Sequence, residues 1–115
     1  MSKKLYCIAS FQPKTKEENS LFKTLQALEP NAQREDGCVH YVVTRQIKNQ
    51  FAEGESYSIV LNEVWASVEA FEAHCQRKEI VDFFETHCID PKGLVEKYNV
   101  VAYSDEPLNY DAPKF

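Results

Sequence analysis

Two histidines and one glutamate are the strongest candidates for acid–base chemistry in this 115-residue chain: His74, His40 and Glu63. A histidine side chain titrates near neutral pH, so it can both accept and release a proton during a reaction. His74 follows Phe71 by three positions in a segment of helical periodicity, which places it beside an apolar helix face. We predict that His74 is a general base, with a core or interface histidine bonded to the backbone as the alternative.

The other two candidates lie in predicted strands. His40 belongs to a β-branched and aromatic stretch and is the second candidate base. Glu63 alternates with Leu61 and Trp65, so its carboxylate is expected on an apolar strand face. Burying a carboxylate is costly unless the charge is paired. We therefore predict either a catalytic or anion-positioning role for Glu63, or a salt bridge to an arginine such as Arg45, across the strands or across a dimer.

The N-terminal third of the chain has the pattern of a strand followed by a helix. Residues 5–11 are strand formers that are apolar on both alternating faces, which is typical of a strand covered on both sides. Thr15 and Glu18 have the capping-box spacing that begins a helix. Pro30 is expected to end or kink that helix, and Gly37 to close the helical segment in a left-handed conformation.

A long hairpin is predicted next. Residues 38–47 and 57–65 are the two strands, and the polar segment between them contains Gly54. This connection exceeds the roughly two to five residues of most hairpin loops. It either flanks a binding pocket or is a tolerated insertion.

The remaining elements complete a known arrangement. Ser67 is predicted to cap a helix whose periodicity continues until Pro91 and Gly93, and residues 98–103 form a last strand. The order β-α-β-β-α-β predicts an α+β, ferredoxin-like fold: a four-stranded antiparallel sheet with helices on one face. Because the strands are apolar on both faces, the uncovered face needs a partner, and we predict a homodimer.

Composition limits the classes of partner. The net charge of −5 and the pI of about 5.2 argue against nucleic-acid binding, which usually requires a basic face. No stretch approaches the roughly 20 apolar residues of a membrane span, and the apolar run at 5–9 is too short for a signal peptide. We expect a cytoplasmic protein without a membrane partner. It comprises one domain over residues 1–104 and a C-terminal tail over 105–115, which is either loose or draped over a neighbouring subunit.

The four cysteines are expected to be free thiols, because they lack CxxC spacing and fall within predicted elements: Cys7, Cys38, Cys75 and Cys88. A zinc site could draw on Cys38, Cys75, His40 or His87, but the usual paired ligand spacing is missing. The chain also lacks a glycine-rich phosphate loop, a nucleophile elbow and a metal-binding helix motif. We therefore expect no metal and no cofactor.

Two short blocks carry a family resemblance. They are Glu-x-Gly-Cys-x-x-Tyr at 35–41 and Glu-x-Trp-x-Ser at 63–67, accompanied by Pro30, Phe71 and His74. Over residues 5–103 the chain resembles the antibiotic biosynthesis monooxygenase family of dimeric α+β barrels, and within it the small quinol monooxygenases. The resemblance implies a pocket between the sheet and its helices.

The implied activity is oxygenation of a small quinol- or anthrone-like aromatic by O2 without a cofactor. The expected substrate-binding walls are aromatic side chains that also serve the core: Phe11, Tyr41, Trp65, Phe71 and Phe84. Two other functions remain open, namely an isomerase of a small phosphorylated carbonyl compound and a non-catalytic dimeric module that binds a small molecule. Haem degradation in this family uses an Asn–Trp–His set, and the aligned positions are Phe11, His74 and Phe84, so the resemblance does not extend to it.

Overall fold

Strict alternation of buried and half-buried side chains defines the two central strands, β1 (Leu5–Pro13) and β3 (Ile59–Trp65). In the computed structural model, which describes residues 3–108, they are flanked by β2 (Cys38–Arg45) and β4 (Val95–Tyr103). All neighbouring strands are antiparallel, in the order β2-β3-β1-β4. This order confirms the predicted ferredoxin-like sheet.

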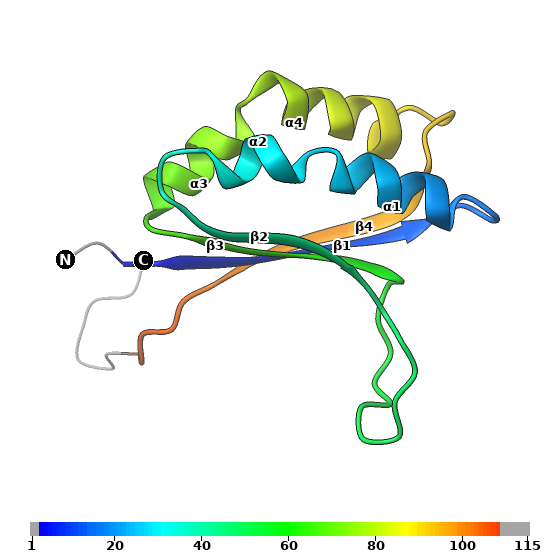
Figure 1. Ribbon diagram of the computed structural model, residues 1–115, viewed down its shortest axis with the longest axis horizontal. Helices are drawn as coiled ribbons and strands as arrows, with labels where there is room; N and C mark the ends of the chain where they lie inside the picture. The colour runs from blue at the N-terminus through cyan, green and yellow to red at the C-terminus, as the bar shows by residue number, and fades with distance from the viewer. Residues whose placement is uncertain (1–2, 109–115) are drawn as a thin grey trace.

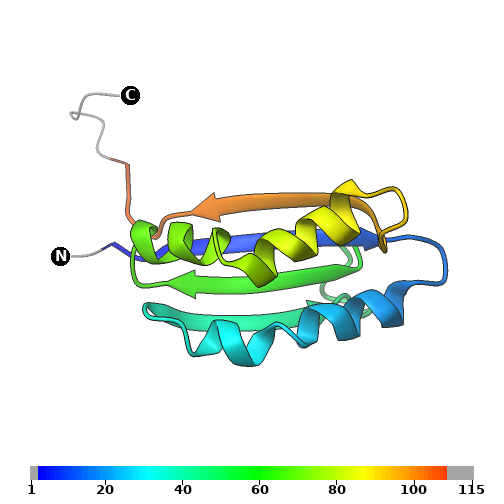
Figure 2. The ribbon, with the colours of Figure 1, turned by 90° about the horizontal axis from the view of Figure 1, so that it is seen from above.

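The helices lie on one face of this sheet and leave the other face uncovered (Figure 1). Helices α1 (Glu18–Gln26) and α2 (Glu29–Gln33) run beside β2, as Figure 2 shows from above. The second half of the layer is formed by α3 (Val68–Cys75), α4 (Lys78–Phe83) and the π-helix η1 (Phe84–Ile89). Within the described residues, no helix is long and apolar enough to cross a membrane.

The core lies between the sheet and the helices. Its largest fully buried side chains come from all layers: Trp65, Tyr41, Phe11, Leu21, Leu25, Ile59 and Cys7. The helix-facing rows of β1 and β3 supply the floor, and the apolar stripe of α1 covers it. The site described below is a part of this interface that the side chains do not fill completely.

The first helix begins later than its capping box predicts. Residues 15 and 16 form a tight turn, in which the Glu17 N–H donates to the Lys14 carbonyl at 2.9 Å and Lys16 has a φ of 69°. The helix therefore starts at Glu18, and its N-cap residue makes no side-chain hydrogen bond. The predicted box at Thr15 is wrong because this turn takes the residues that would have formed it.

The second helical segment has the predicted cap but is not continuous. Ser67 Oγ accepts a hydrogen bond from the Ala70 N–H at 3.1 Å, which confirms Ser67 as the N-cap. Arg77 adopts an extended conformation (φ −68°, ψ 143°) and separates α3 from α4. The single apolar periodicity of the sequence is thus divided between two helices and a π-helical turn.

The long β2–β3 connection does not border the sheet–helix interface. Strand β2 ends at Arg45 and β3 begins at Ile59, two residues inside each predicted boundary. Residues 46–58 project from the sheet on the side away from the helices (Figure 1). These residues do not line the cavity between sheet and helices within the chain, but they line a separate hollow of their own.

Gly37 occupies a position that no other residue fits. Its φ is 82°, and a Cβ atom there would lie 2.6 Å from the Cβ of Ala70 on α3. Both features follow from the tight passage of the chain under α3 into β2, where the Gly37 carbonyl accepts from the Ala66 N–H at 2.7 Å.

We therefore expect Gly37→Ala to lower the free energy of unfolding by about 1–3 kcal/mol, through backbone strain and the collision with Ala70. Urea denaturation measures this change. Gly54→Ala is the matched control, since a Cβ at Gly54 would meet nothing within 4 Å. Equal unfolding midpoints for the two variants would contradict the prediction.

Candidate active site

The strand register brings three functional side chains into one row across the sheet. Cys7 of β1 lies opposite Glu63 of β3, and Glu63 lies opposite Tyr41 of β2. All three are buried and therefore face the helices. His74, near the end of α3, is buried over the same row.

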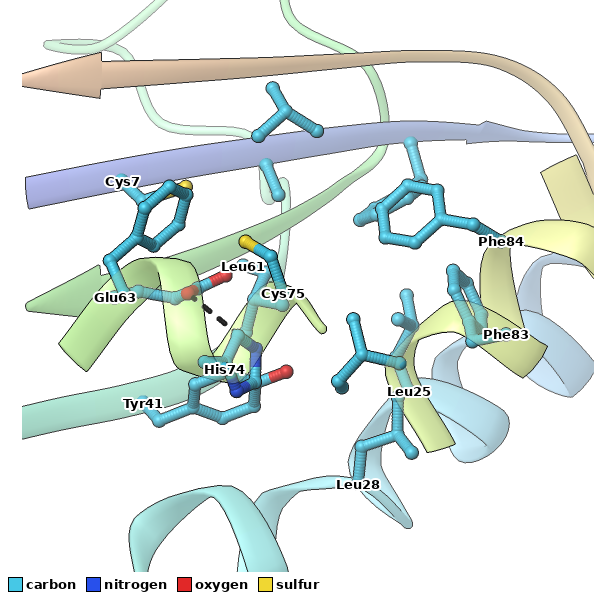
Figure 3. A pocket seen from close by; sticks show the side chains of 15 residues that line it. Cys7, Leu25, Leu28, Tyr41, Leu61, Glu63, His74, Cys75, Phe83 and Phe84 are labelled. Atoms are coloured by element: carbon cyan, nitrogen blue, oxygen red, sulfur yellow. Dashed lines mark ion pairs between the residues drawn. The ribbon is translucent and has the colours of Figure 1, made fainter. Parts of the chain in front are cut away.

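The imidazole of His74 lies between two carboxylates. Its Nδ1 is 2.9 Å from Oε2 of Glu35. Its Nε2 is 4.0 Å from Oε1 of Glu63, as the dashed line in Figure 3 marks. The same Glu63 oxygen accepts a hydrogen bond from Nε1 of Trp65 at 2.8 Å. Arg77 Nε lies 3.6 Å from Glu35 Oε2 and places a cation beside that carboxylate.

Two aromatic rings fix the plane of the imidazole. The centroid of the Trp65 ring system is 4.6 Å from that of His74 at an interplanar angle of 35°, and Tyr41 contacts it edge-on at 5.3 Å. With Glu35 holding Nδ1, the ring has little freedom to rotate. This arrangement favours the tautomer in which Nδ1 carries the proton donated to Glu35 and Nε2 is free to accept another.

Burial favours the protonated forms of the two neighbouring acids. It raises the pKa of Glu63, although the Trp65 hydrogen bond and His74 partly offset the shift. Burial also raises the pKa of the Tyr41 phenol, and Glu63 adds to that effect. Tyr41 therefore remains a hydrogen-bond donor at neutral pH.

A cavity opens beside these groups. Its volume is about 60 Å³, measured as the space open to the centre of a water molecule, so it exceeds the roughly 10–15 Å³ that one water needs. Polar groups occupy one end and apolar side chains the rest (Figure 3). It is lined by Cys7, Ala9, Phe11, Leu25, Leu28, Tyr41, Leu61, Glu63, Phe71, His74, Cys75, Ile80, Phe83, Phe84 and Val100.

Six of the residues singled out from the sequence lie in this lining, namely Phe11, Tyr41, Glu63, Phe71, His74 and Phe84. Trp65 does not line the cavity but contacts the His74 ring and Glu63 from behind. His40 is exposed on the opposite face of the sheet, because it directly precedes Tyr41 and strand neighbours point to opposite sides. The structure therefore does not bring His40 to the cavity.

Within the chain, the partners of Glu63 and His74 differ from those considered in the structural alternatives, while the core position of His74 is as that alternative had it. The nearest ionisable partner of Glu63 is His74, whereas Arg45 is exposed at the end of β2, opposite Ile59. The His74 ring bonds to the Glu35 side chain and not to backbone. Glu35 binds the His74 ring, and Trp65 donates a hydrogen bond to Glu63. The sequence spacing alone could not indicate these partners.

The geometry and the comparisons with known proteins now agree. The model of the antibiotic biosynthesis monooxygenase family matches residues 5–86, which is more than half of the chain. The chain belongs to this family. A comparison with curated proteins gave no match.

Solved structures show the same fold. Protein SO0527 from Shewanella oneidensis is 28% identical with a TM-score of 0.72, over 90% of this chain and 91% of that one. PA3566 from Pseudomonas aeruginosa is 20% identical with a TM-score of 0.73, over 93% and 98%. A dabb family protein from Mesorhizobium loti with a ferredoxin-like fold is 17% identical with a TM-score of 0.67, over 94% and 100%.

In this member of the family, Glu35 is the site residue that sequence reasoning missed. It lies 39 positions before His74, between α2 and β2, and no local periodicity links the two. The only signal was its place in the Glu-x-Gly-Cys-x-x-Tyr block, where it was taken as part of a turn. Its side chain is only 8% exposed, which a helix-terminal glutamate would not need to be.

The thiols near the cavity of this family member are unreactive. Burial raises the pKa of Cys7 to about 12 and that of Cys75 to about 11, so both remain thiols at neutral pH. The residues that the structure describes contain no group of three or more His, Cys, Asp or Glu side chains placed to hold a metal ion. The ionisable chemistry of the cavity therefore centres on His74, Glu63 and Tyr41.

The raised pKa of Glu63 makes stability depend on pH. The folded chain holds this proton more tightly than the unfolded chain, so the associated stability is present below the ordinary glutamate pKa of about 4.3. That stability is lost as the pH rises through the folded pKa. Glu63→Gln should therefore gain stability relative to the parent as the pH rises from about 4 to about 8.

Thermal unfolding across this pH range tests the expectation, with Glu69→Gln on the exposed side of α3 as the control for a lost negative charge. The glutamine can still accept from Trp65. A pH-independent difference between Glu63→Gln and the parent would show that the carboxylate ionises as readily as an exposed one.

Proposed function

We propose that this protein is a cofactor-independent monooxygenase that oxidises a small quinol- or anthrone-like aromatic with O2. The observation that carries the proposal is the His74 ring, fixed by Glu35 at Nδ1 and directed by Nε2 toward an aromatic-lined cavity. A base held this way can take a proton from a bound hydroxyl group, which is the step that makes a quinol reactive toward oxygen.

Each neighbouring group supports this step. Nε2 of His74 accepts the substrate proton, and Glu35 stabilises the imidazolium that results, as a positioning residue. The Tyr41 phenol, which stays protonated at neutral pH, can donate a hydrogen bond to the developing oxyanion. The apolar side chains that line most of the cavity limit contact between the anion and water, which would otherwise stabilise the anion and lower its reactivity.

The reaction balances without an external reductant. The substrate anion supplies four electrons to O2 in total; one oxygen atom forms a bond to substrate carbon and the other leaves as water. A naphthohydroquinone would thereby become a hydroxynaphthoquinone, and an anthrone an anthraquinone. The proton taken by His74 returns to the departing oxygen.

The cavity disfavours the isomerase of a phosphorylated compound. Its lining contains the acidic Glu63 and no lysine or arginine, so a phosphate group would be desolvated there without a permanently charged cation to compensate it. A non-catalytic binding module would use the same cavity. Only turnover distinguishes that function from an oxygenase.

We expect His74→Gln to lower quinol-dependent oxygen uptake at least about 100-fold, because the proton acceptor is lost while the ring volume is largely kept. An oxygen electrode, with naphthohydroquinone or anthrone as substrate and autoxidation subtracted, measures the rate. His40→Gln is the matched control, since His40 lies on the opposite sheet face, and it should retain parent activity.

Retention of activity in His74→Gln would remove the base from the proposal. Absence of uptake by the parent protein across hydroquinones, naphthohydroquinones and anthrones would refute the oxygenase and leave the binding module. Circular dichroism should show that both variants are folded.

We also propose that the uncovered sheet face forms the interface of a homodimer. Its central side chains are half-buried or exposed without any helix over them, and they include Ile8, Val42, Val60 and Val64. The loop 46–58 projects on this same side and carries the almost fully exposed Phe51 (Figure 1). A second copy packed sheet against sheet would cover both features. The cytoplasmic location stays a prediction.

Light scattering at micromolar concentration should give twice the chain mass of 13.3 kDa. Ile8→Lys should shift the mass toward the monomer, because it places a charge at the centre of the proposed interface. Val68→Lys, on the helix layer, should leave the dimer intact. A monomeric parent would refute the interface.

A further inference from the structure

An apolar strip continues from the cavity onto the surface of the edge strand β4. Val100 and Tyr98 pair with Ala9 and Phe11 of β1, so they point to the same face as the cavity floor. Yet they are 44% and 46% exposed, whereas their partners on β1 are buried. Ala102, the next residue on this face, is also exposed and uncharged.

The strip is exposed because the helices stop short of β4. Figure 2 shows β4 at the edge of the sheet, with α3 and α4 over the neighbouring strands. Only the π-helix reaches across, where the Phe84 ring lies 5.7 Å from that of Tyr98. Most of the helix-facing side of β4 therefore remains open to solvent.

The cavity and the strip form one continuous surface. Val100 and Phe84 both line the cavity, and Val100 is at the same time part of the exposed strip. Ala9 lies between Val100 and Leu61 on the neighbouring strands, and its small side chain leaves space above the sheet at this point. A chain of methylene groups that starts at the polar end of the cavity could pass over Ala9 and emerge across Val100.

The volume of the cavity limits what it can enclose. About 60 Å³ is too small to enclose a whole aromatic ring system, so a quinol that reaches His74 and Glu63 must extend beyond the cavity. The helix-facing positions of β4 beside the opening carry no charged side chain: Tyr98, Val100 and Ala102. The exit is therefore suited to an apolar extension and not to a charged one.

We propose that the strip formed by Tyr98, Val100 and Ala102 is a subsite for an uncharged alkyl or prenyl tail of the substrate. The hydroxyl-bearing end of the quinol enters the cavity beside His74, and the rest of the molecule extends across Ala9 so that the tail lies along β4. This inference rests on the proposed function and specifies its substrate as an amphipathic quinol with a single apolar tail. The occupant is the substrate because the strip is continuous with the cavity that receives the hydroxyl-bearing end.

Anaerobic calorimetry tests the subsite without turnover. The probes are naphthohydroquinone and the same head group bearing a hexyl chain. The hexyl compound should bind at least about tenfold more tightly, because burial of a few methylene groups supplies that difference. Val100→Ser and Tyr98→Ser should each remove a large part of this advantage. Tyr98→Ser should also leave the affinity for naphthohydroquinone unchanged, because Tyr98 does not line the cavity.

Val68→Ser is the matched control, since Val68 is 45% exposed, is a surface valine like Val100 and does not line the cavity. It should keep the full advantage of the hexyl probe. Equal affinity of the two probes for the parent, or an equal loss in Val68→Ser, would overturn the subsite. A change of oligomeric mass in Val100→Ser, seen by light scattering, would instead make the strip a subunit contact and would also overturn it.

The outcomes separate this inference from the proposed reaction. If the hexyl probe binds more tightly in a Val100-dependent manner but no quinol is oxidised, the subsite stands and the oxygenase fails. If naphthohydroquinone is oxidised and the tail confers no advantage, the oxygenase stands and the subsite fails.

Discussion

The hydrogen bond between Glu35 and His74 is the interaction on which the site depends. It joins the segment before β2 to the end of α3, two regions 39 residues apart, inside an otherwise apolar layer. A buried imidazole without a partner would cost about 1–3 kcal/mol. With Glu35 in place the ring can be buried, held in one orientation and still present Nε2 to the cavity.

The sheet imposes the other half of the arrangement. Cys7, Glu63 and Tyr41 form one row because they lie opposite one another on paired strands. Their side chains point to the helix-covered face of the sheet, under α3. Gly37 allows the chain to pass close enough to Ala70 for Glu35 to reach the ring. The fold and the site therefore depend on the same tight contact between α3 and the start of β2. A change to this contact would affect both the packing of α3 and the position of Glu35.

The sequence was informative where structure is local. Alternating apolar residues predicted the strands, and Ser67 predicted the start of α3, because these signals act over a few residues. His74 and Glu63 were found as polar residues on apolar faces. Glu35 was missed because its partner is distant in sequence, and His40 was included because the sequence does not say which face of β2 the helices cover. The turn at Lys16 and the break at Arg77 reflect tertiary packing that overrides helical periodicity.

The position of the polar row also determines which side chains a ligand would meet if it approached over the edge strand β4. The ionisable groups lie over the two central strands and β2, where the helices exclude solvent, whereas β4 lies beside them without cover. A ligand that approached over β4 would meet apolar side chains first and the His74–Glu63 pair last. Such an order desolvates the reacting hydroxyl before it reaches the base, so the proton transfer takes place where the electrostatic effects of Glu35 and Tyr41 are least screened. The incomplete helical cover at β4 therefore suits the proposed path of the substrate, because a ligand can approach there without water reaching the buried groups beside it.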